Sequence, residues 1–358
     1  MSAQYTVLDV RSPGEYQHAH IPGAYSLPLF TDEERKVVGT AYKQQCRQTA
    51  IKIGLDYFGV KMRKMVEEVE QLPAERLVTA EKQHLKDSLK QPANTVLVHC
   101  WRGGMRSAGV AWLLDLYGFK VYTLVGGYKA YRKWVRGQFE KHWQMTVLGG
   151  YTGSAKTEVL QQLKQAGSNM IDLEALAHHK GSAFGGLGEL KQPAQEMFEN
   201  LLAQELNCLE NSLTQHAFIE DESQRIGLLK IPDPFWITMR KSHVCFIDVP
   251  FEERLNYLTT EYGKHEKEHL VNATIRIKKR LGGLETKTAI CFLVEDNYKE
   301  CFRILLKYYD KWYSKGLQNR NNLDGLLHKV SCNTINITAN AEKVLDEIKK
   351  LTAAKVNS

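Results

Sequence analysis

The chain has 358 residues, of which 43% are hydrophobic and 25% are charged, a composition typical of a folded protein long enough for two domains. Its first residues lack the apolar segment of a signal peptide and no apolar run reaches the length of a membrane span, so we expect a cytoplasmic protein with no membrane partner. The seven cysteines are scattered and form no CxxC pair, which argues against a disulfide framework and against a zinc site.

The formal net charge is +7, and most of the excess lies in residues 1–140, which contain 20 Lys and Arg against 14 Asp and Glu. A basic half suits anionic substrates, including nucleic acid. Solvated basic faces are common, however, so the charge alone does not predict RNA binding.

The first predicted elements are two short strands. One covers residues 5–10 and ends in Asp-Val-Arg, and the other lies within residues 21–28 after a Pro-Gly turn. The next connection, residues 31–91, is much longer than a usual loop, and apolar periodicity at 41–58 and 60–72 predicts helices there. We therefore predict a helical insertion beside the reactive loop described next, with plain packing as the alternative.

The stretch Val-Leu-Val-His-Cys-Trp-Arg-Gly-Gly-Met-Arg-Ser around Cys100 predicts a strand, a loop and the start of a helix. Gly103 and Gly104 allow the loop to curl, so that its N–H groups and the positive end of the helix face a bound anion. A thiolate at Cys100 would be stabilised by these groups and by the guanidinium groups of Arg102 and Arg106. Cys100 is therefore a candidate nucleophile. The alternative is a buried cysteine that packs as a small hydrophobe.

A second strand, loop and helix begins at residue 145. Its loop, Gly-Gly-Tyr-Thr-Gly-Ser-Ala-Lys-Thr, matches the phosphate-binding pattern G-x-x-x-x-G-K-[ST], with Ala155 where the last glycine is expected. The N–H groups of such a loop surround a diphosphate, Lys156 reaches its outer oxygens, and the hydroxyl of Thr157 reaches Mg²⁺ if one is present. The methyl group of Ala155 adds crowding, so the loop does not by itself identify a nucleoside triphosphate as the ligand. The predicted diphosphate-binding residues are Gly150, Thr152, Gly153, Ser154, Lys156 and Thr157.

A further strand at residues 216–219 leads into the acidic run Glu220-Asp221-Glu222. P-loop proteins place a carboxylate that binds the metal or orients water at this position. Asp221 is therefore a candidate for holding Mg²⁺ through water or for acting as a base, and Arg225 is a candidate for pairing with phosphate. The alternative is that Glu220 and Glu222 only cap and solubilise the start of a helix.

The rest of the chain alternates strands and helices, which predicts a second parallel sheet containing a strand at 244–250. In the basic segment 264–287, we expect Arg276, Lys279 and Arg280 to share one helical face. Such a face suits a lid that closes on phosphate, a contact with an RNA backbone, or simple solvation.

Near the end of the chain, residues 289–315 are predicted to be helical. A cluster of aromatic residues within this helix is expected to lie in the core: Tyr308, Tyr309, Trp312 and Tyr313. The pattern predicts a last strand at 333–338 and a closing helix at 341–351.

Four N-terminal motifs resemble the rhodanese domain. They are Asp-x-Arg from residue 9, Glu-Tyr-x-x-x-His-Ile-Pro-Gly-Ala from residue 15, the cysteine loop, and Gly-Gly-x-x-Ala-aromatic from residue 126. With the phosphate loop and the motifs Asp-Leu-Glu-Ala, Gly-Ser-Ala-Phe-Gly and Glu-Asp-Glu-Ser-x-Arg-Ile-Gly that follow it, nearly the full chain resembles the tRNA 2-selenouridine synthase family. The resemblance implies an α/β fold, with a rhodanese-like parallel-sheet domain at 1–138 and a P-loop kinase-like α/β domain at 143–358.

The same resemblance implies a selenium-transferring enzyme that acts on 2-thiouridine at the wobble position of the tRNA anticodon. Selenophosphate is the implied selenium donor, an S-geranylated uridine made from geranyl diphosphate is the implied intermediate, and no tightly bound cofactor is expected. We predict that the phosphate loop holds the diphosphate group of geranyl diphosphate. Cys100 is predicted to receive selenium as a seleno-persulfide, from which selenium attacks C2 of the base as geranylthiol leaves.

Three alternatives remain open. The first is a rhodanese sulfurtransferase fused to an ATP-dependent kinase-like domain. The second is a phosphatase, because five residues separate Cys100 from Arg106, as in dual-specificity phosphatases, although the loop has no acidic residue. The third is an RNA-binding module without enzymatic activity.

Overall fold

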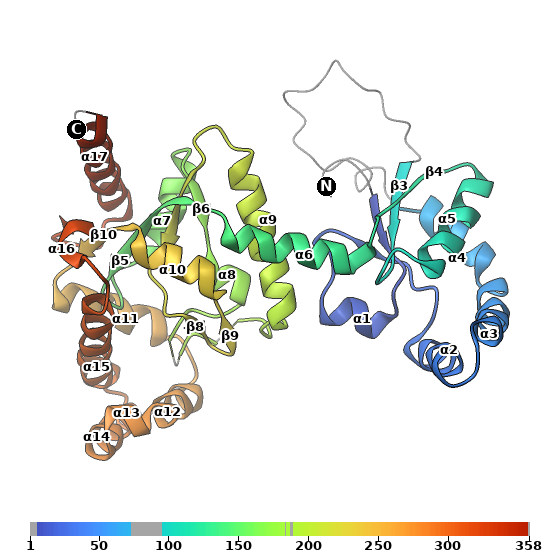
Figure 1. Cartoon of the computed structure of the whole chain (residues 1–358). Coiled ribbons are helices and arrows are strands. Elements are labelled where there is room, and N and C mark those ends of the chain that lie inside the picture. The colour runs from blue at the N-terminus through green and yellow to red at the C-terminus, as the bar shows by residue number, and fades with distance from the viewer. Residues whose placement is uncertain (1–5, 73–94, 183, 187–188, 357–358) are drawn as a thin grey trace. The chain divides into compact units, whose positions relative to one another are not determined.

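The computed structural model describes residues 6–72, 95–182, 184–186 and 189–356 (Figure 1). The chain divides into two compact units. The first comprises Met1–Gly137 with Glu199–Leu201, and the second comprises Gln138–Phe198 with Leu202–Ser358. Each unit contains a parallel β-sheet and its own hydrophobic cluster.

The first unit contains a four-stranded parallel sheet with the strand order β2-β1-β3-β4. Its strands are β1 (Thr6–Asp9), β2 (Tyr25–Ser26), β3 (Thr95–His99) and β4 (Lys120–Thr123). Helices α1 (Pro13–His18) and α5 (Met105–Tyr117) belong to this unit, and α6 (Gly127–Glu140) begins in it. The apolar residues of β1 and β3 are buried, as expected for parallel strands covered on both faces. Because Asp9 pairs with His99 in register, the Asp-x-Arg motif and the cysteine loop emerge side by side.

The long connection between β2 and β3 is helical in its described part. It contains α2 (Asp32–Gln44), α3 (Arg47–Gly59) and α4 (Met62–Glu70). The single helix predicted at 41–58 is wrong, because Cys46 interrupts it and accepts a hydrogen bond on Sγ from the N–H of Thr49 at 3.5 Å. Phe58 and three residues of α4 join the hydrophobic cluster of the sheet, so these helices pack onto the core. The remainder of the predicted insertion, residues 73–91, lies outside the described residues.

The second unit contains a five-stranded parallel sheet with the strand order β11-β10-β5-β7-β6. Its strands are β5 (Gln144–Gly150), β6 (Asn169–Ile171), β7 (His216–Glu220), β10 (His243–Asp248) and β11 (Leu327–Ser331). Helices α7 (Lys156–Gln165) and α17 (Ile337–Val356) share a buried cluster with this sheet. The phosphate loop follows the central strand β5, at the sheet edge where open α/β folds bind their ligands.

The last strand is β11, and the strand predicted at 333–338 is wrong. Asn336 explains the difference, because its side chain accepts a hydrogen bond from the N–H of Ala339 at 3.0 Å. A polar side chain that binds an N–H group in the first turn marks the start of a helix. The polar residues of this stretch therefore lead into α17.

Shorter elements connect the strands of the second unit. They are α8 (Leu173–Ala177), α9 (Gln195–Glu210), α10 (Asp233–Lys241) and the antiparallel pair β8 (Arg225–Ile226) and β9 (Leu229–Lys230). No helix in the part of the chain that the structure describes is long and apolar enough to cross a membrane.

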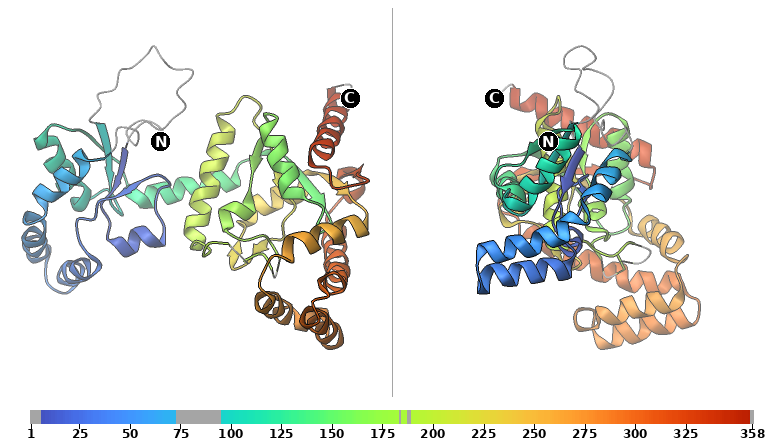
Figure 2. Two further views of the ribbon diagram at one scale, coloured as in Figure 1. Left: turned by 180° about the vertical axis from the view of Figure 1, so that it is seen from behind. Right: turned by 90° about the vertical axis from the view of Figure 1, so that its right-hand side faces the viewer.

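A group of helices fills the connection between β10 and β11. It consists of α11 (Phe251–Tyr262), α12 (Lys267–Arg276), α13 (Lys278–Leu281), α14 (Gly283–Val294), α15 (Tyr298–Gln318) and α16 (Leu323–Leu326). In Figures 1 and 2, α12, α13 and α14 lie together beside one end of α15.

Two helix predictions in this region are wrong. Arg276 ends α12, whereas Lys279 and Arg280 belong to α13, so the three basic residues do not share one helical face. The helix predicted at 289–315 is also divided, because α14 ends at Val294 and α15 starts at Tyr298. Asp296 between them has a φ of +58°, a left-handed conformation that ends a helix.

Candidate active site

The cysteine loop joins the end of β3 to α5, and Cys100 at its start is buried, with 3% of its surface exposed. Its Sγ atom lies 3.3 Å from the hydroxyl oxygen of Ser107. Burial alone would raise the pKa of the Cys100 thiol. Hydrogen bonds from the Ser107 hydroxyl and from the N–H groups of Ser107, Gly104 and Arg102 outweigh burial and lower this pKa. The loop therefore stabilises a thiolate mainly through its backbone and one hydroxyl group.

The sequence predicted that both arginines of the loop stabilise the thiolate of Cys100. The structure places them in different surroundings. Arg106 donates a hydrogen bond to the carboxylate of Glu15 at 3.0 Å, and Arg35 contacts the same carboxylate at 2.9 Å. The charge of Arg106 is thus balanced within the protein. Arg102 is exposed at the surface of the loop.

Glycines at two positions allow the loop to pack against the start of α6. Gly103 has a φ of +66°, and a Cβ atom there would lie 2.7 Å from the carbonyl oxygen of Leu124. Gly127 has a φ of +59°, and a Cβ atom there would overlap the carbonyl oxygen of Cys100. Gly104 has a φ of −104° and open space at its Cβ position, so the predicted need for glycine applies to Gly103 only. The sequence pattern did not reveal that Gly127 serves the cysteine loop.

The exposed part of the cysteine loop covers residues 101–105. It includes the large side chains of Trp101 and Met105, which are 37% and 50% exposed. The Cys100 residue itself is buried, so the exposed residues 101–105 are the part of the loop that a substrate meets first.

The phosphate loop joins β5 to α7 and so has the predicted arrangement of strand, loop and helix. Lys156 donates a hydrogen bond from Nζ to the carbonyl oxygen of Gly150 at 3.1 Å, and Nζ lies 3.9 Å from Oε1 of Glu220. Ala155 has a φ of +56°, a left-handed conformation that costs an alanine about 1 kcal/mol. The alanine thus adopts a conformation for which glycine is the usual residue.

The predicted diphosphate-binding residues fall into two groups. Four of them line the adjacent cavity: Thr152, Gly153, Lys156 and Thr157. Gly150 instead donates its N–H to the hydroxyl of Tyr313 at 3.1 Å, and the buried Ser154 donates its hydroxyl to the carbonyl oxygen of Tyr151 at 2.8 Å. Gly150 and Ser154 therefore shape the loop.

Two side chains from distant helices hold the phosphate loop in place. Arg254 of α11 is buried and donates hydrogen bonds to the carbonyl oxygen of Thr152 at 3.0 Å and to Asp310 of α15 at 2.9 Å. Tyr313 of α15 accepts the N–H of Gly150, as described above. The sequence analysis missed Arg254 and Tyr313 because no local pattern links them to the loop.

Three glutamates from two segments meet beside Lys156 and Thr157. Glu174, Glu220 and Glu222 each place a carboxylate oxygen within 4.8 Å of the others. The Thr157 hydroxyl lies 3.2 Å from Glu220 and 3.4 Å from Glu174. Burial, followed by repulsion from neighbouring carboxylates, raises the pKa of each glutamate. Carboxylate oxygens arranged in this way could hold a divalent cation such as Mg²⁺.

The structure changes the roles predicted for the acidic run. Asp221 accepts hydrogen bonds from Arg320 and, at 2.7 Å, from the Tyr313 hydroxyl, so its carboxylate is already engaged. The alternative that Glu220 and Glu222 cap a helix is wrong, because β8 follows them. Arg225 is exposed on β8 and is not among the residues that line the cavity. The carboxylates that lie together with Glu174 as candidate cation ligands are therefore those on either side of Asp221.

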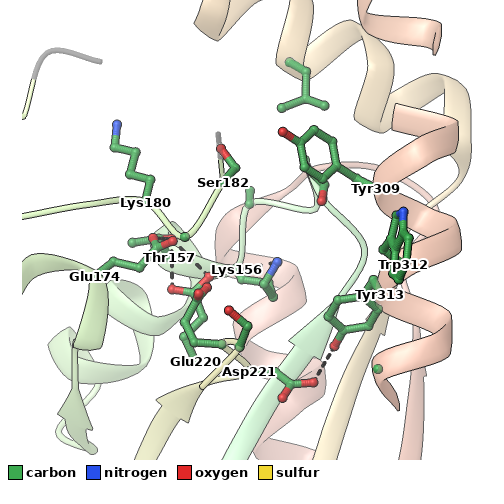
Figure 3. Close-up of a pocket in the computed structure, with 18 of the residues that line it drawn as sticks. Lys156, Thr157, Glu174, Lys180, Ser182, Glu220, Asp221, Tyr309, Trp312 and Tyr313 are labelled. Carbon is green, nitrogen blue, oxygen red and sulfur yellow. Dashed lines mark hydrogen bonds and ion pairs between the residues drawn. The ribbon is translucent and has the colours of Figure 1, made fainter. Parts of the chain in front are cut away.

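A cavity of about 890 Å³ contains the phosphate loop and the three glutamates in its lining (Figure 3). Four aromatic side chains of α15 form one side of it: Tyr308, Tyr309, Trp312 and Tyr313. The prediction that these residues lie in the core is wrong for Trp312, which is exposed. Tyr309 packs against a buried hydrophobic cluster and Tyr313 contacts Phe246 of the sheet, although both also border the cavity. Figure 3 shows Lys180 and Ser182 on the side opposite Tyr309 and Trp312, with Lys156 between them.

Comparisons with known proteins agree with this two-part organisation. A rhodanese-like domain matches residues 1–133, and the tRNA 2-selenouridine synthase AAA domain matches residues 143–336. The tRNA 2-selenouridine synthase of Nitrosomonas europaea is 36% identical over 265 residues, which is 73% of this chain and 64% of that relative. The tRNA 2-selenouridine synthases of Bdellovibrio bacteriovorus and Aeromonas salmonicida are each 34% identical over 88% of this chain, and the matches cover 89% and 88% of those relatives.

Proposed function

The chain belongs to the tRNA 2-selenouridine synthase family, a family of tRNA-modifying transferases, and we propose that it exchanges sulfur for selenium in two steps at two sites. Geranyl diphosphate first alkylates the sulfur of a wobble 2-thiouridine, and selenophosphate then supplies the selenium. The observation that carries this proposal is the cavity in which a phosphate-binding loop lies beside a wall that contains Tyr257, Leu258 and Tyr262. A hydrolase of simple phosphates would not need such a wall.

The geranylation step is assigned to the phosphate loop. As the allylic C–O bond breaks, its electron pair leaves with the diphosphate, whose growing charge is stabilised by the loop N–H groups and Lys156. The sulfur of the base forms the new C–S bond, and the base loses its N3 proton. The geranyl chain lies against Leu258 and Tyr257, which line the cavity beside Gly153.

A divalent cation suits this step because a diphosphate would otherwise lie beside several buried carboxylates. Glu174, Glu220 and Glu222 would hold Mg²⁺, which would supply charge neutralisation at the leaving group. Thr157 orients two of these carboxylates through its hydroxyl group.

The selenium step is assigned to the cysteine loop. The groups that lower the pKa of Cys100 favour the thiolate form that reacts in this step. The thiolate takes selenium as a neutral atom from selenophosphate, which leaves as phosphite. The selenium of the seleno-persulfide then attacks C2, the C2–S bond breaks, and geranylthiol departs with a proton. Two thiols then reduce the remaining Se–S bond and are oxidised to one disulfide, which frees the selenouridine and Cys100.

The variants Cys100→Ser and Lys156→Ala test this division of labour, with mass analysis of tRNA nucleosides as the readout. Cys100→Ser is expected to retain geranylation and to lose 2-selenouridine. Lys156→Ala is expected to lose geranylation and still to selenate tRNA that was geranylated chemically. Loss of both steps in Cys100→Ser, or failure of Lys156→Ala on the geranylated tRNA, would contradict the proposal.

Phosphorus NMR of the spent selenium donor tests the role of Cys100 separately. Phosphite is expected when selenium passes through the seleno-persulfide. Phosphate as the sole product would show that selenophosphate attacks the base directly, so that Cys100 does not carry selenium. Consumption of ATP in place of geranyl diphosphate would favour the kinase-like alternative.

A further inference from the structure

Two aromatic residues of α15, the exposed Trp312 and the partly exposed Tyr308, form a ledge at the cavity. Tyr308 and Trp312 lie one helical turn apart, with ring centroids 6.4 Å from each other, and both line the cavity. Trp312 is 42% exposed. Neighbouring aromatic rings that remain open to water beside a binding site indicate a surface that a partner covers.

Positive charges surround this ledge. The guanidinium carbon of Arg280 lies 5.9 Å, and Nζ of Lys315 lies 5.2 Å, from the centre of the Trp312 ring. Lys278 and Lys279 are exposed next to Arg280 on the short helix α13. Among the described residues, none of these four cations forms an ion pair with a carboxylate. The surface therefore has a net positive charge that a partner can neutralise.

Exposed rings interleaved with such cations are typical of surfaces that bind single-stranded nucleic acid. Bases of any sequence stack on the rings, while Lys and Arg contact the backbone phosphates. A hydrocarbon chain suits this ledge poorly, because it would take water away from Arg280 and Lys315 and return no hydrogen bond. An acidic peptide would satisfy the charges but would leave the flat faces of Tyr308 and Trp312 without a matching group.

We propose that α13 and α15 form the docking surface for the single-stranded anticodon loop of the RNA substrate, with an unpaired base stacked on Trp312 beside Tyr308. Backbone phosphates of the loop contact Arg280 and the lysines beside it. This inference rests on the proposed function, since a thiouridine must approach the diphosphate held by Lys156. The ledge and Lys156 line the same cavity, which allows one RNA loop to meet both (Figure 3).

Fluorescence anisotropy with a labelled anticodon stem-loop RNA, in the absence of geranyl diphosphate and selenophosphate, tests the proposal on the full chain. Loss of one stacking contact in Trp312→Ala is expected to weaken RNA binding about 10-fold or more, whereas Trp312→Phe retains most of the affinity. Arg280→Ala is expected to lower the slope of log affinity against log salt by about 0.7, the value for one phosphate contact with single-stranded RNA. Lys287→Ala is the matched control, because Lys287 is exposed on α14 and does not line the cavity.

Two outcomes would overturn the proposal. One is unchanged RNA affinity in Trp312→Ala, measured on protein whose circular dichroism and melting temperature equal those of the parent. The other is weaker binding of geranyl diphosphate with unchanged RNA binding, which would make the ledge a site for the prenyl chain. Because the binding assay contains no reaction, RNA affinity that depends on Trp312 would support the docking surface even if the proposed chemistry failed.

Discussion

The cysteine loop and the phosphate loop are built alike and differ in the charges around them. Each follows a parallel strand and leads into a helix whose N–H groups favour an anion. In the first, the anion belongs to the protein, since the thiolate of Cys100 is stabilised by its own loop. In the second, the loop lies beside Lys156 and three glutamates, two of them buried, whose pKa values are raised.

This difference shows that two loops with similar backbones can suit different reactions. The cysteine loop is ready to react once a substrate reaches the thiol, because it needs no further charge. The phosphate loop carries excess negative charge beside its anion-binding groups, so it needs protons or a cation before a diphosphate can bind. We therefore expect the second site to be the more sensitive to pH and to Mg²⁺.

The largest expected effect comes from Lys156→Ala. Removal of the cation that stabilises the departing diphosphate is expected to slow geranylation by about 10²–10³-fold, the usual effect of losing one charge-stabilising donor. Rates of geranylated nucleoside formation measure this effect. Lys164→Ala on the exposed side of the same helix is the control, and a less than tenfold loss in Lys156→Ala would place the diphosphate elsewhere.

Gly127→Ala tests whether the cysteine loop depends on its contact with α6. The new Cβ atom would overlap the carbonyl oxygen of Cys100 at a φ of +59°, so we expect a loss of about 2–4 kcal/mol in the free energy of unfolding. Gly104→Ala has open space and a negative φ, and it should cost less than about 1 kcal/mol. Urea denaturation of the intact chain compares the two variants, and equal stabilities would refute the contact.

Glu174→Gln probes the negative charge at the phosphate loop. Burial and repulsion raise the pKa of Glu174, so the folded state holds a proton that the unfolded state has already released. Stability of the parent protein should therefore fall as the pH rises from 5 to 8, and the variant should gain about 1 kcal/mol or more at pH 8 and little at pH 5. Glu342→Gln, at an exposed position on α17, should show no such difference. A gain for Glu174→Gln that is independent of pH would contradict the charge argument.

Ser107→Ala gives the smallest expected effect. Loss of the hydroxyl group that binds Cys100 should raise the pKa of the thiol and slow its alkylation at pH 7 by about 3- to 10-fold, equivalent to one hydrogen bond of about 1 kcal/mol. The difference between the two rates should shrink as the pH rises towards 10, because the variant then gains a larger share of thiolate. The alkylation rates are measured by mass spectrometry after modification with iodoacetamide. A rate difference that persists at pH 10 would indicate that the substitution changes the access of the reagent to the thiol.

Local residue patterns determined much of this protein. The strand, loop and helix around Cys100 and around Lys156 follow from apolar runs that end in glycine-containing loops, because backbone sterics and helix periodicity act over a few residues. The same patterns did not predict where helices end, as at Cys46 and Asp296. Several residues near each end are compatible with a continued helix.

Only the tertiary structure decided which side chains share a site. Glu174, Glu220 and Glu222 look ordinary in the sequence and become a charged cluster because the loops after neighbouring strands converge. Asp221, the more obvious candidate, is engaged by Arg320, which lies 99 residues further along the chain. Trp312 of α15 is exposed at the cavity while Tyr309 of the same helix packs against a buried cluster, because the packing of whole helices sets the direction of each face. Such pairings depend on contacts between distant segments, and no local pattern encodes them.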